Sequence, residues 1–158
     1  MSNTRRLDEV SIFNDKLTFL IPHEWIEVES GEDGSYLYQV ADALSGWFRV
    51  SLITQNDVVN PAVRLKDLFS QDPNVAVNKT TGNLIRRSDK ETTEDGSRIH
   101  IYYWFVGSIV LPKKVCEAVF SYTVLADLTN TDETQSEVAL LGQLVSEARF
   151  NPAAFANA

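Results

Sequence analysis

Two stretches of the sequence decide the fold: Arg98-Ile-His-Ile-Tyr-Tyr-Trp-Phe-Val106 and Val115-Cys-Glu-Ala-Val-Phe-Ser-Tyr-Thr-Val-Leu125. Both are rich in β-branched and aromatic residues, which favour strands. Successive side chains of a strand point to opposite faces, so each stretch predicts one long strand with two different faces. A polar turn, Glu94-Asp95-Gly96, precedes the first stretch and predicts a hairpin with the segment before it.

Two helices are predicted around these strands. The first begins at Asn60-Pro61, because Asn is a good N-cap and Pro suits the first helical position. It ends at Asp72-Pro73, since a residue before proline avoids helical angles. The second runs from about Thr131 to Arg149, with capping-box spacing between Asn130 and Glu133. The residues after it, Asn151 to Ala158, are expected to form a frayed tail.

The remaining apolar segments read as strands, and most of the connections between them look like hairpins. The element order is therefore strands, helix, strands, helix. This order predicts an α+β fold with a mainly antiparallel sheet and helices packed on it. No Pro/Gly-rich linker divides the chain, so residues 1–158 are expected to form one domain. The further predicted strands are Val10–Asn14, Leu17–Ile21, Trp25–Val28, Tyr36–Ala41, Trp47–Thr54 and Leu84–Ser88.

Composition narrows the class of partner. The chain has 158 residues and a net charge of −8. An acidic protein repels the phosphate backbone, so nucleic-acid binding is disfavoured and a basic protein partner is favoured. The single cysteine, the absence of an apolar export segment and the absence of a run long enough to cross a bilayer indicate a cytoplasmic protein. The sequence does not determine the oligomeric state.

Two segments resemble the PsbP-like fold group. Leu17-Thr-Phe-Leu-Ile-Pro-His-Glu-Trp25 is similar to the group's apolar strand, proline and tryptophan, although Glu24 stands where the group commonly has a small or flexible residue. Val145-Ser-Glu-Ala-Arg-Phe-Asn-Pro152 is similar to its closing helix and short strand. The resemblance implies an α/β/α sandwich around an antiparallel sheet. The group includes photosystem subunits, a Ran-binding import factor and bacterial effector chaperones, so the resemblance implies partner binding rather than one reaction.

No motif for catalysis, a metal or a cofactor is present. His23 and His100 are the two histidines, and neither lies in a metal-ligand spacing. Cys116 lies within a strand-like run, where a free cysteine is usually packed in the core. No glycine-rich phosphate loop, nucleophile elbow or dinucleotide fingerprint occurs. We therefore expect a protein that is not an enzyme and takes no cofactor or metal.

One set of side chains suggests a binding surface. Ile99, Ile101, Tyr103 and Phe105 share one face of their strand and are expected to pack under helices. If neighbouring strands contribute to the opposite face, it combines aromatic rings with Arg, His, Ser and Thr, as binding hot spots do. The alternative is a face covered by a helix or loop, or one that is half solvated. The predicted partner-binding residues are Trp47, Arg49, Arg98, His100, Tyr102 and Trp104.

The sequence thus leaves several functions open. The first is a non-enzymatic protein-binding module, either an adaptor or chaperone for a secreted effector or an immunity protein that caps a toxin. The second is a small-molecule or lipid-binding domain, with the aromatic face lining a pocket. The third, an enzyme with a site assembled from distant residues, has no motif to support it. An apolar cavity between the sheet and a helix would favour the second, and an exposed aromatic patch the first.

Overall fold

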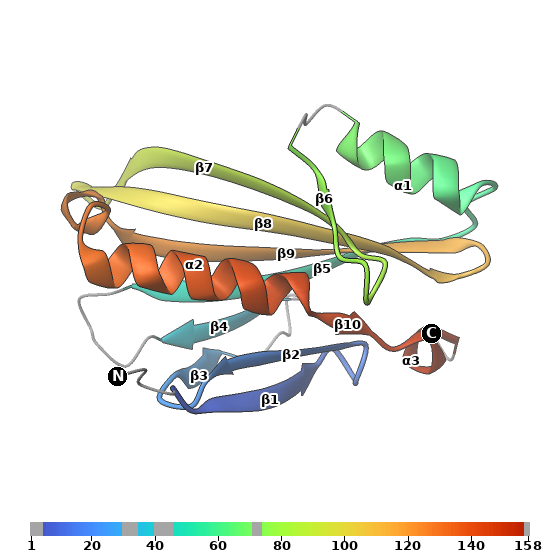
Figure 1. The fold of residues 1–158 in the computed structure, drawn as a ribbon, viewed down its shortest axis with the longest axis horizontal. Helices are drawn as coiled ribbons and strands as arrows, with labels where there is room; N and C mark the ends of the chain where they lie inside the picture. Colours follow the sequence, from blue (N-terminus) through green and yellow to red (C-terminus); the bar gives the residue numbers. More distant parts are fainter. Residues whose placement is uncertain (1–4, 30–34, 40–45, 71–73, 157–158) are drawn as a thin grey trace.

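A seven-stranded antiparallel sheet forms the centre of the molecule in the computed structural model, which describes residues 5–29, 35–39, 46–70 and 74–156 (Figure 1). Its strand order is β3-β4-β5-β9-β8-β7-β6. The two stretches that decide the fold are its central strands β8 and β9, which pair along almost their whole length. The strands are β3 (Ile26–Glu29), β4 (Ser35–Gln39), β5 (Trp47–Gln55), β6 (Ala76–Val77), β7 (Leu84–Glu94), β8 (Ser97–Leu111) and β9 (Lys114–Leu125).

A second, three-stranded sheet joins the two ends of the described chain. It consists of β1 (Leu7–Ile12), β2 (Leu17–Pro22) and β10 (Arg149–Phe150), in the order β1-β2-β10. β2 alternates buried and half-buried side chains, and its buried residues Leu17, Phe19 and Ile21 point into the core. The α+β class with mainly antiparallel sheets is therefore confirmed.

One face of the large sheet is covered by this small sheet and by helix α2 (Asp132–Ser146). Val138, Leu141 and Val145 lie on one side of α2 and are buried, as the helical spacing of the sequence predicts. They pack with aromatic rings from the sheet and from the segment around Trp25. The largest fully buried side chains of this layer are Trp104, Tyr38, Tyr122, Phe48 and Phe120.

The other face is covered at one end by helix α1 (Pro61–Phe69). Asn60 caps this helix, as predicted, because its side-chain oxygen accepts a hydrogen bond from the Val63 backbone N–H. Leu65 and Phe69 are buried against the sheet, where Gly107 of β8 has no side chain to hold them away. The predicted stop at Asp72-Pro73 is not tested, because residues 71–73 lie outside the described residues.

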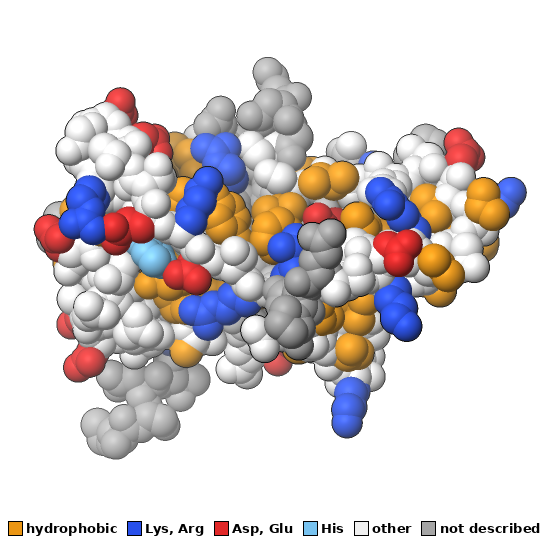
Figure 2. All heavy atoms as spheres, turned by 90° about the horizontal axis from the view of Figure 1, so that it is seen from above, with side chains coloured by type: hydrophobic (Ala, Val, Ile, Leu, Met, Phe, Trp, Pro, Cys, Tyr) orange, Lys and Arg blue, Asp and Glu red, His pale blue; other side chains and the backbone are white. Residues whose placement is uncertain are grey.

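The two edges of the large sheet differ. β3 is short, and its register with β4 shifts between Glu27 and Glu29. At the other edge, β6 pairs only with the start of β7, at Leu84 and Ile85. The rest of β7 pairs with β8 alone among the described strands, and it carries acidic and basic side chains that intermingle on this side of the molecule (Figure 2). Charged side chains are a common protection of an edge strand.

Two predictions near the chain's C-terminal end are wrong. The N-cap of α2 is Thr131 rather than Asn130, since the Thr131 hydroxyl accepts from the Thr134 backbone N–H. The stretch predicted to fray instead forms helix α3 (Pro152–Ala156), and Phe155 is 1% exposed. Phe155 is buried beside Val110 and Cys116, and this contact fixes the segment. A short 3-10 helix, η1 (Ala126–Leu128), leads from β9 toward α2.

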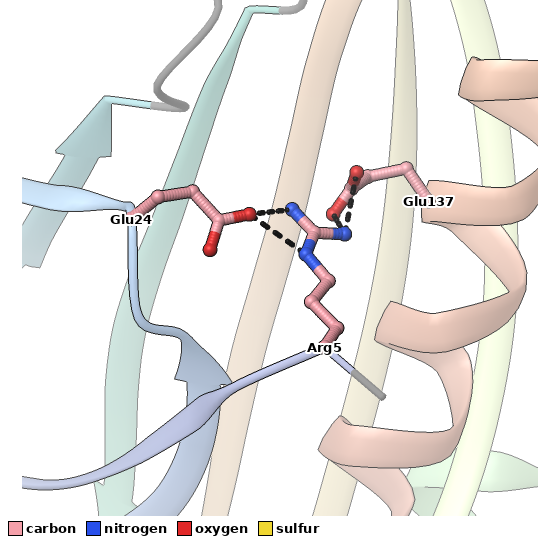
Figure 3. Close-up of polar contacts among 3 residues, drawn as sticks. All are labelled: Arg5, Glu24 and Glu137. Atoms are coloured by element: carbon pink, nitrogen blue, oxygen red, sulfur yellow. Dashed lines mark hydrogen bonds and ion pairs between the residues drawn. The ribbon is translucent and has the colours of Figure 1, made fainter. Parts of the chain in front are cut away.

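Arg5 ties three distant parts of the chain together (Figure 3). Its Nε donates to Glu24 Oε1 at 2.7 Å, and its Nη1 donates to Glu137 Oε1 of α2 at 2.8 Å. The partly buried guanidinium would lose stability by desolvation, but the hydrogen bonds to both carboxylates outweigh that loss and raise the pKa of Arg5. Glu24, where the PsbP-like group commonly has a small or flexible residue, is thus an anchor for the N-terminal segment.

Candidate functional site

The part of the large sheet that faces away from α2 and is not covered by α1 forms the candidate site. Arg49 on β5 lies opposite Ser121 on β9, and Ser121 lies opposite Tyr103 on β8. Opposed residues in an antiparallel pair project to the same face. The neighbouring row repeats the arrangement, with Trp47 at its β5 end. We call this surface the open face and define it by Leu37, Trp47, Arg49, Ser51, Ile101, Tyr103, Val119, Ser121 and Thr123.

A hollow of about 680 Å³ lies over the open face. At one end, the tip of the β7–β8 hairpin forms its wall, with Glu94 and Asp95 among the lining residues. At the other end, the sheet continues under α1, where Phe105 packs against the helix. Trp47 lies at the rim of the hollow and is 42% exposed. The hollow therefore offers apolar surface, hydroxyl groups and charges of both signs.

Arg49 is held in place by a polar contact. Its Nη1 donates to the Ser35 hydroxyl of β4 at 3.0 Å. Within the described part of the chain, no carboxylate lies within ion-pair distance of Arg49, although the side chain is exposed in a strongly acidic protein. The guanidinium thus lines the hollow and has no charge partner among the residues that the structure describes.

The six predicted binding residues do not share one surface. Trp47 and Arg49 lie on the open face, whereas Tyr102 and Trp104 point to the α2 side and are 5% and 2% exposed. The prediction that Ile99, Ile101, Tyr103 and Phe105 pack under helices is correct for Phe105, which packs against α1, and wrong for the other three, which line the hollow. The alternation along each strand is as predicted, but the register between strands joins the row of Arg49 to that of Tyr103 instead of Trp104.

Arg98 and His100 lie on the same side of β8 as Tyr102, close to the β7 edge. Arg98 pairs with Glu91, and His100 Nε2 lies 2.6 Å from Asp89 Oδ2. Both contacts join β8 to β7, so each of these two side chains has a polar partner on the neighbouring strand. Arg98 and His100 are therefore separated from the hollow, and they act in the structure as cross-strand pairs.

The described residues contain no group of three or more His, Cys, Asp or Glu side chains that could hold a metal ion. His23 is distant from His100 in the sequence. It contacts Asp8, with 2.7 Å between its Nδ1 and Asp8 Oδ2. The two described histidines thus contact different carboxylates, Asp8 for His23 and Asp89 for His100, and they do not belong to one cluster.

Cys116 lies in the core, as predicted. It is fully buried, with Thr54 Oγ1 at 3.7 Å from its Sγ. Burial raises the pKa of the thiol to about 12, so it stays protonated at neutral pH. A thiolate is the nucleophilic form of cysteine, and this environment disfavours it.

Glu117 marks the border between the open face and α1. It lies opposite Gly107 in the sheet, and partial burial raises the pKa of its carboxyl, while nearby Arg86 opposes the shift. The Arg86 guanidinium lies 3.8 Å from the centre of the Phe105 ring, and its Nε is buried without a hydrogen-bond partner among the described residues. A buried carboxyl was not identified from the sequence, because a strand glutamate usually faces solvent.

No family model matches the chain, and no functionally curated protein matches it. Crystal structures with a similar fold include the following three. A protein from Bacteroides thetaiotaomicron VPI-5482 has a TM-score of 0.60 and 18% identity over 90% of this chain. The Saccharomyces cerevisiae Ran-binding protein Mog1p has a TM-score of 0.54 and 9% identity over 96% of this chain and 99% of its own. LpqN of Mycobacterium tuberculosis, involved in cell envelope biogenesis, has a TM-score of 0.52 and 13% identity, covering 95% of this chain and 93% of LpqN.

The chain has a Mog1/PsbP-like fold. The fold implied by the sequence resemblance is therefore confirmed. At these identities the similarity concerns the arrangement of helices and strands alone. The chain spans 48% of the length of the Bacteroides protein. Among the described helices, none has the length and apolarity that a bilayer crossing requires.

Proposed function

We propose that this chain is a non-enzymatic protein-binding module and that the open face receives its partner. The observation that carries the proposal is the hollow, which places exposed Trp47 beside Arg49 and Tyr103 on a rigid sheet. Tryptophan, tyrosine and arginine are the residues most enriched in binding hot spots.

The fold gives this proposal further support. Mog1p is described as a Ran-binding protein, and it covers nearly the same length as this chain. Within the class of protein-binding modules, we propose an adaptor or chaperone for a secreted effector, or an immunity protein that caps a toxin, as the specific role. Either role requires a preformed surface and no reacting group.

Binding of a small molecule or lipid is the second candidate. A volume of about 680 Å³ lies within the usual range of roughly 300–1,000 Å³ for small-molecule pockets. However, the hollow lies on an open sheet face rather than between the sheet and a helix, so a ligand there would remain partly in water. This geometry favours a protein segment.

The test is quantitative capture of partners from the native lysate by the tagged chain and four variants. Trp47→Ala and Arg49→Glu change the open face. Ile53→Ala, an exposed apolar residue further along β5, and Arg98→Glu, an exposed arginine outside the hollow, are matched controls. We expect capture of one stoichiometric protein by the wild type and both controls, and about tenfold or greater loss for both open-face variants.

Equal capture by Trp47→Ala, Arg49→Glu and the wild type would contradict the proposal, provided that circular dichroism shows all the variants folded. A small molecule that co-purifies with the wild type, in the absence of a protein, and is lost from Trp47→Ala would establish the second candidate instead.

A further inference from the structure

Arg49 differs from the three described arginines that form ion pairs. Arg5, Arg98 and Arg149 each pair with at least one carboxylate. Arg49 makes one hydrogen bond, to Ser35, within the described part of the chain. A guanidinium has five N–H donors arranged to receive a carboxylate through two parallel hydrogen bonds. Among the described residues, Arg49 therefore retains donors without a partner, and it lines the hollow while Ser35 fixes the position of the group.

Hydroxyl groups surround this cation on the open face. Ser121 lies directly opposite Arg49, and Ser51 lies two residues along β5 on the same face. Thr123 follows Ser121 on the same face of β9. Hydroxyls can donate to an oxygen that the guanidinium does not reach. An anionic group placed beside Arg49 would thus meet several donors and no described acidic side chain of β5 or β9 within the hollow.

The opposite corner of the hollow has the opposite charge. Glu94 and Asp95 line it at the tip of the β7–β8 hairpin, and neither forms an ion pair with a described basic residue. Between the two corners the sheet presents apolar surface from Ile101, Tyr103 and Val119. The surface therefore runs from a cation on β5, across apolar side chains, to carboxylates beyond β8.

We infer that the partner enters the hollow with an extended segment in which an acidic and a basic residue flank apolar ones. The acidic side chain binds Arg49 and its neighbouring hydroxyls, and the basic side chain binds Glu94 and Asp95. This inference rests on the proposed function above and specifies the chemistry of the partner. It departs from the expectation of a basic partner, which came from the net charge alone.

The dimensions of the sheet suit such a segment. Arg49 lies in the same cross-strand row as Tyr103, six residues along β8 from Ser97, which pairs with Glu94 at the hairpin tip. With about 3.3 Å per residue along a strand and about 4.8 Å between strands, the charged corners lie roughly 20–25 Å apart. An extended peptide covers about 3.3 Å per residue and would span this distance with roughly six to eight residues. Charge pairs that become desolvated at an interface also set the orientation of the bound segment.

The test uses fluorescently labelled short peptides, blocked at both ends so that the termini bring no charge. In the reference peptide, Glu and Lys flank a run of apolar residues. In two control peptides, Gln replaces either Glu or Lys. We expect the wild-type protein to bind the reference peptide about tenfold more tightly than the peptide without Glu, as measured by fluorescence anisotropy. Raising the salt concentration should reduce this preference.

Protein variants test whether the preference for Glu in the peptide depends on Arg49 and whether the preference for Lys depends on Glu94 and Asp95. Arg49→Gln should abolish the preference for Glu, whereas Arg98→Gln, the matched control, should keep it. The double variant Glu94→Gln/Asp95→Asn should abolish the preference for Lys. These substitutions concern exposed side chains, and thermal unfolding of each variant verifies that the fold is intact.

The inference is overturned if the peptides bind equally well, if none binds, or if Arg49→Gln keeps the preference for Glu. The capture experiment distinguishes this result from failure of the proposed function. Partner capture that depends on Trp47, together with binding that ignores peptide charge, would retain the binding module and reject the charged segment. Absence of both capture and peptide binding would reject both.

Discussion

At the scale of single residues, the ionised carboxylate of Glu117 is expected to destabilise the folded state. Partial burial raises the pKa of its carboxyl, with Arg86 opposing the shift. A raised pKa means that the folded state holds the proton more tightly than the unfolded chain. The resulting stability is present at pH values below the usual glutamate pKa of about 4.3 and is lost as pH rises through the raised pKa.

Glu117→Gln should therefore raise the melting temperature at pH 7, because glutamine carries no charge that burial disfavours. The gain should shrink at pH 4, where the wild-type carboxyl is largely protonated. Thermal unfolding followed by circular dichroism at both pH values measures this difference. An equal change at the two pH values would show that the effect comes from packing instead of ionisation.

The limits of the sequence also appear at this scale. Alternation correctly separates Phe48 and Val50 from Trp47 and Arg49, and it places Cys116 in the core. It does not reveal that Arg49 shares a row with Tyr103, since that depends on strand pairs far apart in the chain. Four of the six predicted site residues were consequently assigned to the wrong face, although Trp47 and Arg49 were correctly placed together.

At the scale of elements, α1 depends on a missing side chain. A Cβ at position 107 would lie 2.7 Å from Phe69 Cε1 and 2.8 Å from Leu65 Cδ1. Gly107→Ala should destabilise the protein by about 1–3 kcal/mol, because α1 must shift away from β8.

In α2, a Cβ at Gly142 would meet Trp104 Nε1 at 3.4 Å, a tolerable contact. Gly142→Ala should raise the free energy of unfolding by roughly 0.5–1 kcal/mol, the usual gain when alanine replaces glycine within a helix.

Urea unfolding of both glycine variants gives the two free energies. Similar stability changes of the same sign would contradict the assigned packing of α1.

Most elements could be predicted because hydrophobic periodicity and capping residues are local signals. Asn60 gave the start of α1, but α2 offered two adjacent capping residues, and Thr131 is the one used. α3 was missed because a short alanine-rich segment after Pro152 has no periodicity of its own. Its position depends on Phe155, which is buried only because the sheet provides a site for it.

At the scale of the whole molecule, Arg5 joins the N-terminal segment to α2 and to the turn before β3. Its partner Glu137 has a side chain that is only 13% exposed. Arg5→Met should destabilise the protein by about 1–3 kcal/mol, because the mostly buried Glu137 carboxylate would lose the hydrogen bonds and the positive charge of Arg5. Arg149→Met removes the pair with Glu9, in which both side chains are more than 60% exposed, and should cost under about 1 kcal/mol.

Urea unfolding at low and high salt measures both arginine variants. Equal losses for Arg5→Met and Arg149→Met would show that the partly buried pair is no stronger than the exposed one.

The pairing of β2 with β10 has a consequence for the order in which this protein forms during synthesis. β2 is made before most of the large sheet, yet its second neighbour, Arg149–Phe150, is made only after that sheet and α2. α2, which covers the aromatic layer of the large sheet, is also made late. A nascent chain that has already produced β8 and β9 therefore lacks the cover for their buried rings. Contacts across such long sequence separations also slow folding. Completion of the core thus waits until α2 and Arg149–Phe150 have been made, and until then the chain exposes the side chains that are most prone to associate.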